Sequence, residues 1–253
     1  MRNILAIAAR DIRSSFVTPI AYVVFAGFLL LSGFFFFTLL QQFNPMSEQA
    51  AMMRDMTPNL NEWVVGPYFQ TMEVVLIFLV PLLTMRSIAE EKHNGTFEML
   101  MTSPVSVGQI VLGKAFAVGF VSFVMLLLSF VFPAVLIAFA DPEVPPILIG
   151  FLGLLLFTWA FAAIGLAVSA FTRSQTVAGV VSLVVLLIFY VIDAPTSQLG
   201  PEAGSFFKYL APTSHIEMML KGVLQGSDLV YFASVILFGL FVANRALDAQ
   251  RWR

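Results

Sequence analysis

Cysteine is absent from the 253-residue sequence, and its absence removes several kinds of chemistry at once. A chain without thiols forms no disulfide, no zinc–thiolate site and no cysteine nucleophile. Histidine is scarce too, with two residues, and neither an H-E-x-x-H nor a G-x-S-x-G pattern occurs. Because these patterns mark metallohydrolases and serine hydrolases, the sequence predicts no catalytic residue, no metal site and no cofactor bound by this chain.

Charged residues are also few. Only 11% of the residues are charged, whereas 59% are hydrophobic and 27 are Phe. In soluble domains about a quarter of the residues are charged and about half are apolar. The composition therefore excludes an ordinary soluble protein and predicts an integral membrane protein.

Six stretches are long and apolar enough, or nearly so, to cross a bilayer core, which takes roughly 20 residues of helix. They are about 18–40, 67–85, 114–140, 146–171, 176–192 and 229–247. No internal repeat is evident, which weakens the case for an inverted-repeat transporter. The links leave no room for a soluble domain, so residues 1–253 are expected to form a single all-α transmembrane domain with six spans.

Basic residues predict the orientation of these spans. With both termini on one side, that side holds ten of the 13 Lys and Arg residues: Arg2, Arg10, Arg13, Arg86, Lys92, Lys114, Arg173, Arg245, Arg251 and Arg253. Because cytoplasmic loops carry the excess of Lys and Arg, both termini are predicted to be cytoplasmic in a multi-pass protein of the cytoplasmic membrane.

Residues 1–16 precede the first span with an amphipathic pattern. One helical face carries the apolar residues Leu5, Ala8, Ala9, Ile12 and Phe16. This pattern favours an interfacial helix on the inner leaflet; the alternative is a plain charged anchor for the first span.

Two external segments are long. The segment at about 41–66 is bracketed by Asn44-Pro45 and Thr57-Pro58, so the first helix is expected to end before it and one short amphipathic helix to lie within it. The segment at about 193–228 is broken at Pro212 into two pieces that are apolar but too short to span. These pieces predict a re-entrant hairpin between spans five and six.

The loop at 86–113, between spans two and three, is predicted to be cytoplasmic and holds the densest charge of the chain. Asn94-Gly95 is a stop signal for the helix that leaves span two. Ser106 and Gln109 form a capping box that predicts a new helix from about Val107. Between them, Thr96 to Ser103 can form a short cytoplasmic helix that ends at Pro104.

Gly108 to Ala115, GQIVLGKA, nearly matches the G-x-x-x-x-G-K-[ST] pattern of a phosphate-binding loop. It lacks the final Ser or Thr and enters an apolar helix instead of following a strand. We therefore expect that the chain is not an enzyme and does not hydrolyse ATP by itself.

The loop and its flanks, PLLTMRSIAEEKHNGTFEMLMTSPVSVGQIVLGKAFA, resemble the signature region of the permeases of ABC type 2 transporters. DIRSSFVTPIAYVVFAGFLLLSGFFFF and YLAPTSHIEMMLKGVLQGSDLVYF are similar to the gliding-motility and nitrous-oxide-reductase-maturation permeases of that family. The resemblance implies a dimer of six-span subunits, each resting a cytoplasmic coupling helix on a separate ATP-binding subunit that holds the ATP and Mg.

Carried over to this sequence, the resemblance places the coupling helix at Thr96 to Ser103. It implies polar contact with the ATPase by Glu91 and Lys92, a turn at Gly95, docking by Phe97, Glu98 and Leu100, and an end at Pro104. The alternative, which we favour for Glu90, is an ordinary solvated loop.

Glu73 lies in the second predicted span, where an acidic residue is unusual. Acids inside a membrane usually face the bundle interior or a wet cavity. Glu73 is therefore a candidate for contact with a transported substrate; the alternative is a structural role facing water.

Two functions fit these features. The first is the permease subunit of an ABC exporter, which pairs with a second copy of itself or a related permease, with the ATPase and with the bilayer, and has no nucleic-acid partner. The second is an ATP-driven mechanical or structural subunit that transmits force to a periplasmic or membrane-anchored accessory protein and moves no solute. The sequence does not reveal the substrate, and the direction of transport follows only from the resemblance.

Overall fold

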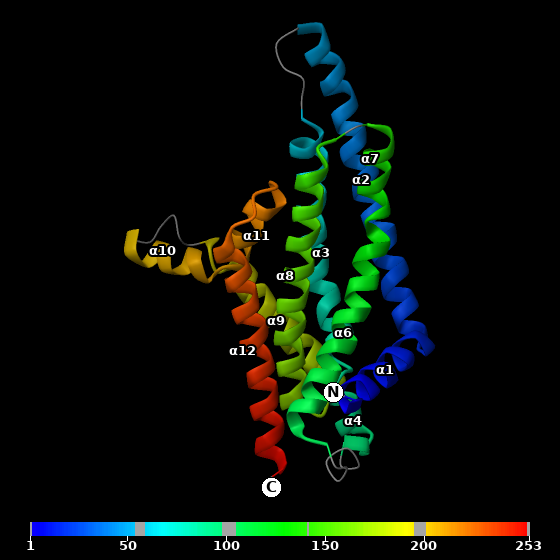
Figure 1. Ribbon diagram of the computed structural model, residues 1–253, viewed down its shortest axis with the longest axis vertical. Coiled ribbons are helices and arrows are strands. Elements are labelled where there is room, and N and C mark those ends of the chain that lie inside the picture. The colour runs from blue at the N-terminus through cyan, green and yellow to red at the C-terminus, as the bar shows by residue number, and fades with distance from the viewer. Residues whose placement is uncertain (1, 54–58, 98–104, 141, 195–200, 252–253) are drawn as a thin grey trace.

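The computed structural model describes residues 2–53, 59–97, 105–140, 142–194 and 201–251, and within these ranges every regular element is a helix (Figure 1). The elements are α1 (Arg2–Val17), α2 (Pro19–Met53), the π-helix η1 (Asn61–Val65), α3 (Gly66–Thr84), α4 (Ala89–His93), α6 (Val107–Ser129), α7 (Val131–Phe139), α8 (Val144–Phe171), α9 (Gln175–Val191), α10 (Pro201–Leu210), α11 (Pro212–Leu220) and α12 (Gly226–Arg251). The predicted all-helical membrane protein is thereby confirmed.

Each predicted span overlaps a helix, and the third overlaps two, α6 and α7. In the described part of the chain, five stretches are long and apolar enough to cross a membrane: Pro19–Pro45, Asn61–His93, Val107–Phe139, Val144–Phe171 and Gly226–Gln250. The sixth, α9, has 17 residues. At 1.5 Å per residue it is about 25 Å long, slightly short of a bilayer core of roughly 30 Å.

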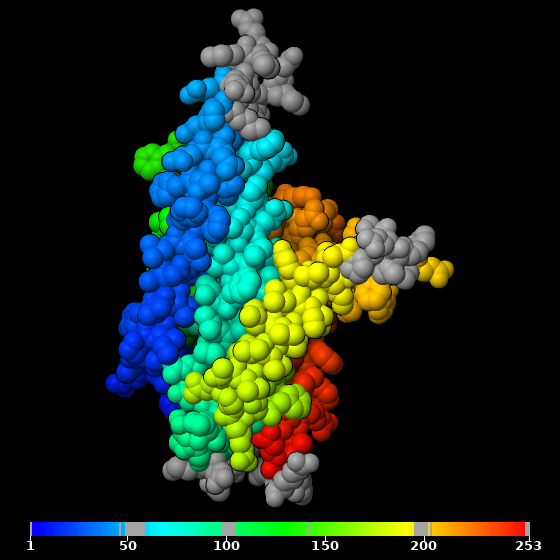
Figure 2. All heavy atoms as spheres, turned by 180° about the vertical axis from the view of Figure 1, so that it is seen from behind, coloured from blue at the N-terminus to red at the C-terminus, as the bar shows by residue number. Residues whose placement is uncertain are grey.

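Helix α8 is the central helix of the bundle and contacts α3, α6, α9, α11 and α12. Small residues let its neighbours approach closely. A Cβ atom built at Gly165 of α8 would lie 2.3 Å from Thr84 Oγ1 of α3, and one built at Gly239 of α12 would lie 2.9 Å from Ala163 Cβ. On the opposite side, α2, α3 and α9 lie side by side (Figure 2).

The N-terminal helix forms as predicted and crosses the lower end of the bundle obliquely (Figure 1). Leu5, on the predicted apolar face, is 67% exposed, whereas Ile7 and Ala8 are buried. Ile7 packs onto α6 at Gly113, where a Cβ atom would lie 2.8 Å from the Ile7 side chain. Helix α1 is thus fixed to α6 by one side while another apolar side stays open.

The helix that contains the first predicted span runs further than predicted. We expected it to end before Asn44-Pro45, but α2 continues through Pro45 to Met53 and projects beyond the other helices (Figure 1). A proline inside a helix removes one backbone N–H and so leaves the carbonyl four residues earlier without its donor. At about 52 Å, the 35-residue helix extends well past a bilayer core of roughly 30 Å, and there water can satisfy that carbonyl. The Ser47 hydroxyl also donates to the Asn44 carbonyl at 2.7 Å. The short helix expected within 41–66 lies partly outside the described residues.

The external segment is broken at Pro212, as predicted, with α10 pointing sideways and α11 running along α8 (Figure 1). His215 of α11 holds this corner. Its Nδ1 lies 2.8 Å from Asp228 Oδ1, its Nε2 lies 3.0 Å from the Tyr209 carbonyl, and its ring stacks on Tyr231 at 4.0 Å. The start of α12 is thereby joined to the junction of α10 and α11. The re-entrant path of this segment into a membrane stays a prediction.

Candidate functional site

The predicted coupling loop begins where α3 passes through a turn into α4, at the same end of the bundle as α1 and the C-terminal end of α12 (Figure 1). Ser169 of α8 fixes this turn. Its buried hydroxyl accepts hydrogen bonds from the backbone N–H groups of Ile88 (3.2 Å) and Ala89 (3.0 Å) and donates to the Met85 carbonyl (3.3 Å). Ser169 of α8 thus satisfies the first backbone N–H groups at the start of α4.

Gly95 reverses the chain after α4. Its φ of +72° lies in the left-handed region, and nothing lies within 4 Å of a Cβ atom built there. The left-handed backbone conformation therefore favours glycine here, whereas the space around the residue would admit a side chain. The predicted stop at Asn94-Gly95 is confirmed, because α4 ends at His93 and Thr96 and Phe97 are already helical again.

Of the residues assigned to the coupling helix, the structure describes only Thr96 and Phe97. The hydroxyl of Thr96 is exposed and donates to the Glu91 carbonyl at 3.3 Å. Phe97 is 8% exposed and packs with Ile88 and Leu247, among other residues. Its ring therefore holds the segment against the bundle. Glu98, Leu100, Ser103 and Pro104 lie outside the described residues, so their roles stay predictions. The other side of the loop is as predicted, because Ser106 and Gln109 form the capping box and α6 begins at Val107.

Lys92 is turned toward α8. Its ammonium donates to the Ala170 carbonyl in the last turn of that helix and lies 5.4 Å from the centre of the Phe97 ring. The Gln250 side chain of α12 donates to the same carbonyl at 3.2 Å. A cation near the end of a helix is favoured by its unpaired carbonyls and by its dipole. Lys92 thus joins α4 to the end of α8.

Glu91 belongs to a group of four charges around the buried Lys114, namely Arg10, Asp11, Glu91 and Lys114, here called the charge cluster. Lys114 is 1% exposed, and its Nζ lies 3.0 Å from Asp11 Oδ2, 2.8 Å from Glu91 Oε2 and 2.6 Å from the Ser87 carbonyl. Arg10 Nη2 lies 2.8 Å from Asp11 Oδ1 and 2.5 Å from Glu91 Oε1. Two carboxylates therefore balance two cations.

The charge cluster joins three helices that are distant in the sequence: α1, α4 and α6. Burial alone would lower the pKa of Arg10, but the carboxylates of Asp11 and Glu91 outweigh burial and raise that pKa above its ordinary value. Arg10 therefore stays charged at physiological pH.

A cavity of about 330 Å³ adjoins the charge cluster, and polar and apolar residues line it. The Arg86–Glu90 pair, 3.3 Å apart, lies on its wall.

Sequence reasoning placed Glu91 and Lys92 toward the ATPase, whereas the structure engages both side chains within the chain. It left Asp11 and Lys114 out of the site entirely. The sequence connected Lys114 with the orientation of the spans and with the near-match to a phosphate-binding loop, but with no acidic partner. One signal could have revealed its role, because a lysine about two turns inside an apolar helix needs an acidic partner.

Glu73 lies apart from the charge cluster, toward the other end of α3. It is 5% exposed, and its Oε1 has no hydrogen-bond partner among the residues that the structure describes. Asp193 and Glu217 interact with it electrostatically, and it does so in turn with Tyr190 of α9. The second predicted site therefore lies among α3, α9 and α11. Across the described ranges, no three His or acidic side chains come together as metal ligands.

Comparison with models of protein families gives a match. A model of the family described as ABC-2 family transporter protein matches residues 3–246, nearly the whole chain. No curated protein matches the sequence.

Proposed function

The chain belongs to the ABC-2 family of transporter proteins and is a permease subunit of an ABC transporter; from this premise we propose that two copies form a dimer that exports a substrate from the cytoplasm. Each copy binds a separate ATP-binding subunit through the segment 86–104, whose end of the bundle faces the cytoplasm. ATP and Mg are bound by that partner.

The observation that carries this proposal is the connection of α4 to the rest of the bundle. On one side Ser169 and the Ala170 carbonyl hold α4 to α8, and on the other side Lys114 and Arg10 hold Glu91 to α6 and α1. The chain turns sharply at Gly95 just after these contacts. A load applied beyond Gly95 therefore reaches three further helices through ion pairs and hydrogen bonds, as a coupling element requires.

The division of labour with a separate ATPase is supported by the near-match to a phosphate-binding loop. Residues 108–114 lie inside α6, which begins at Val107. In a phosphate-binding loop the backbone N–H groups point at the phosphates, whereas in a helix they are used by carbonyls four residues earlier. This helical geometry does not suit phosphate binding, which supports the proposal that a separate partner binds the ATP.

Copurification with a candidate ATPase tests the coupling. We expect Gly95→Pro to abolish binding, because the fixed negative φ of proline cannot form the turn, and Glu98→Arg to abolish it by reversing a charge on the docking helix. Gly95→Asn, which tolerates a left-handed conformation, and Glu202→Arg on the exposed surface of α10 are the matched controls. Full binding by Gly95→Pro and Glu98→Arg would contradict the assignment.

Transport is tested with the complex reconstituted in vesicles, by asking whether ATP stimulates uptake or efflux of candidate solutes. Glu73→Gln should change this transport without changing copurification of the ATPase, because Glu73 lies in α3 away from α4. A complex that moves no solute, yet copurifies tightly with an external protein, would instead be a mechanical subunit.

A further inference from the structure

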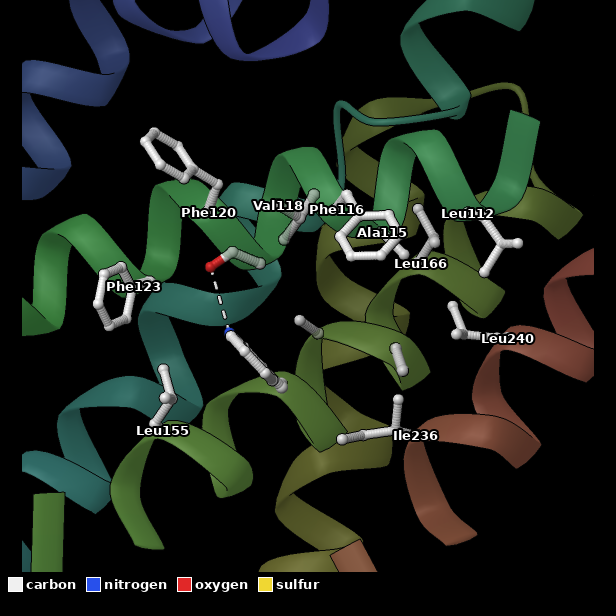
Figure 3. Close-up of a pocket in the computed structure, with 14 residues that line it drawn as sticks. Leu112, Ala115, Phe116, Val118, Phe120, Phe123, Leu155, Leu166, Ile236 and Leu240 are labelled. Carbon is white, nitrogen blue, oxygen red and sulfur yellow. Dashed lines mark hydrogen bonds between the residues drawn. The ribbon is translucent and has the colours of Figure 1, made fainter. Parts of the chain in front are cut away.

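An apolar groove lies between α6, α8 and α12, on the side of α6 that does not face α1. Phe116 and Phe120 of α6, Trp159 of α8, and Ile236 and Leu240 of α12 line it (Figure 3). Its volume is about 490 Å³, within the range of roughly 300–1,000 Å³ that small-molecule sites occupy. The groove is thus large enough for a ligand.

Small residues keep the groove open. Ala115 and Gly119 of α6 and Ala162 and Ala163 of α8 are among the residues that line it. The indole N–H of Trp159 donates to the Gly119 carbonyl at 3.2 Å, as the dashed line in Figure 3 shows. This bond fixes the ring across the floor and satisfies the indole N–H, a polar group that faces the groove. An occupant therefore needs to be apolar and gains nothing from hydrogen-bonding groups.

The position of the groove indicates which apolar occupant it meets. All three helices contain stretches long and apolar enough to cross a membrane, so the open side of the groove faces lipid hydrocarbon. An empty groove would forfeit dispersion contacts along its whole lining. A helix of a protein partner fits poorly: at about 10 Å in diameter it would take up 490 Å³ within roughly 6 Å, little more than one turn. An extended acyl chain is far thinner and can follow the groove from Leu112 to Phe123.

We propose that this groove binds one acyl chain of a phospholipid from the leaflet on the α1 side of the membrane. Leu112 lies five residues after the start of α6, and Leu240 lies in the second half of α12, so the groove begins near the end of the bundle that carries the charge cluster. Lys114 of that cluster and Phe116 of the groove are two residues apart and face different sides of α6. The bound chain fills the space between α6 and α12 beside the residues that join α6 to α4. The lipid site depends on the membrane setting of the family and not on the proposed coupling to an ATPase.

Photolabelling of the full chain tests the site directly, without an ATPase present. The protein is reconstituted in phosphatidylcholine vesicles that contain a phosphatidylcholine with a diazirine in the middle of one acyl chain, and labelled positions are mapped by mass spectrometry. Phe116 of the groove and Val180 of α9 are exposed to similar extents, 61% and 58%. We expect labels to concentrate on Phe116, Phe120 and Leu240 over Val180. Equal labelling of both surfaces would overturn the proposal, because it would show general contact with lipid.

Two variants that fill the groove make the test sharper. Ala115→Phe places a ring in it from α6, and Leu240→Phe does so from α12, so that either can carry the test if the other does not fold. Each should lower groove labelling about tenfold, which corresponds to about 1.4 kcal/mol of lost binding. Ala26→Phe, on the exposed face of α2, is the matched control and should leave groove labelling unchanged. Undiminished labelling in a folded groove variant, or crosslinking of two copies through α6 and α12 in place of lipid labelling, would overturn the proposal.

Discussion

Replacing Lys114 by Met should destabilise the protein strongly while keeping the length and most of the volume of the side chain. The change removes the ammonium that lies within 3.0 Å of Asp11 and Glu91 and leaves these carboxylates, which are 19% and 16% exposed, with Arg10 as the remaining cation of the cluster. Removing one partner of a buried ion pair costs about 3–5 kcal/mol where the other charge is left without compensation. Because Arg10 still pairs with both carboxylates, the free energy of unfolding in mild detergent should fall by less, about 1–3 kcal/mol.

The matched control is Lys221→Met, which removes the same chemical group from an exposed pair. Lys221 Nζ lies 2.6 Å from Glu217 Oε1, but the two side chains are 58% and 55% exposed. A pair so open to water contributes about 0–1 kcal/mol. The double variant Lys114→Met with Glu91→Gln should recover part of the loss, since it removes one of the unpaired charges, and the coupling energy should be about 0.5–3 kcal/mol. Equal effects of the two lysine substitutions, or strictly additive effects of Lys114→Met and Glu91→Gln, would refute the account of the charge cluster.

Three further substitutions test the packing around the site. Ser169→Ala should lower the free energy of unfolding by about 1–3 kcal/mol, because it leaves two buried N–H groups without an acceptor, whereas Ser205→Ala at an exposed serine should change chemical denaturation little. Gly165→Ala should cost about 1–3 kcal/mol through overpacking against α3, while Gly27→Ala, with nothing within 4 Å, should not; an equal shift in both would contradict the close approach of α3 and α8. Glu73→Gln should raise thermal stability, because it replaces a buried acid whose ionised form is unfavourable beside two other carboxylates, and a loss of stability would contradict that arrangement.

Local signals in the sequence predicted the local features of the site. The capping box at Ser106 and Gln109, the left-handed turn at Gly95 and the break at Pro212 each depend on a few adjacent residues, and each was found where the pattern placed it. Pro45 shows the limit of such signals. A proline weakens a helix by an amount that surrounding water can offset by bonding the freed carbonyl, so its presence alone does not end one.

The charge cluster could not be predicted in the same way, because it depends on how helices pack. Asp11 and Lys114 are 103 residues apart, and they meet only because Ile7 packs onto α6 at Gly113. The sequence holds both charges and the glycine, but without the arrangement of α1 on α6 no spacing rule connects them. The contacts of Glu91 were missed for the same reason. The sequence shows that Glu91 is charged, but it does not show that Arg10 and Lys114 are its partners.

Helix α4 contacts α8 on one side and α1 and α6 on the other, and the two sides use different interactions. Its contacts with α8 are hydrogen bonds through Ser169 and Lys92, whereas its contacts with α1 and α6 are ion pairs of the charge cluster. Lys114→Met should therefore release α1 and α6 from α4, and Ser169→Ala should release α8, so the two variants loosen opposite sides of the same short helix. If both sides carry the load from the ATPase, each variant should lower ATP-stimulated transport without lowering copurification of the ATPase. An effect of Ser169→Ala alone would instead show that α8 carries the load and that α1 and α6 only support the helix.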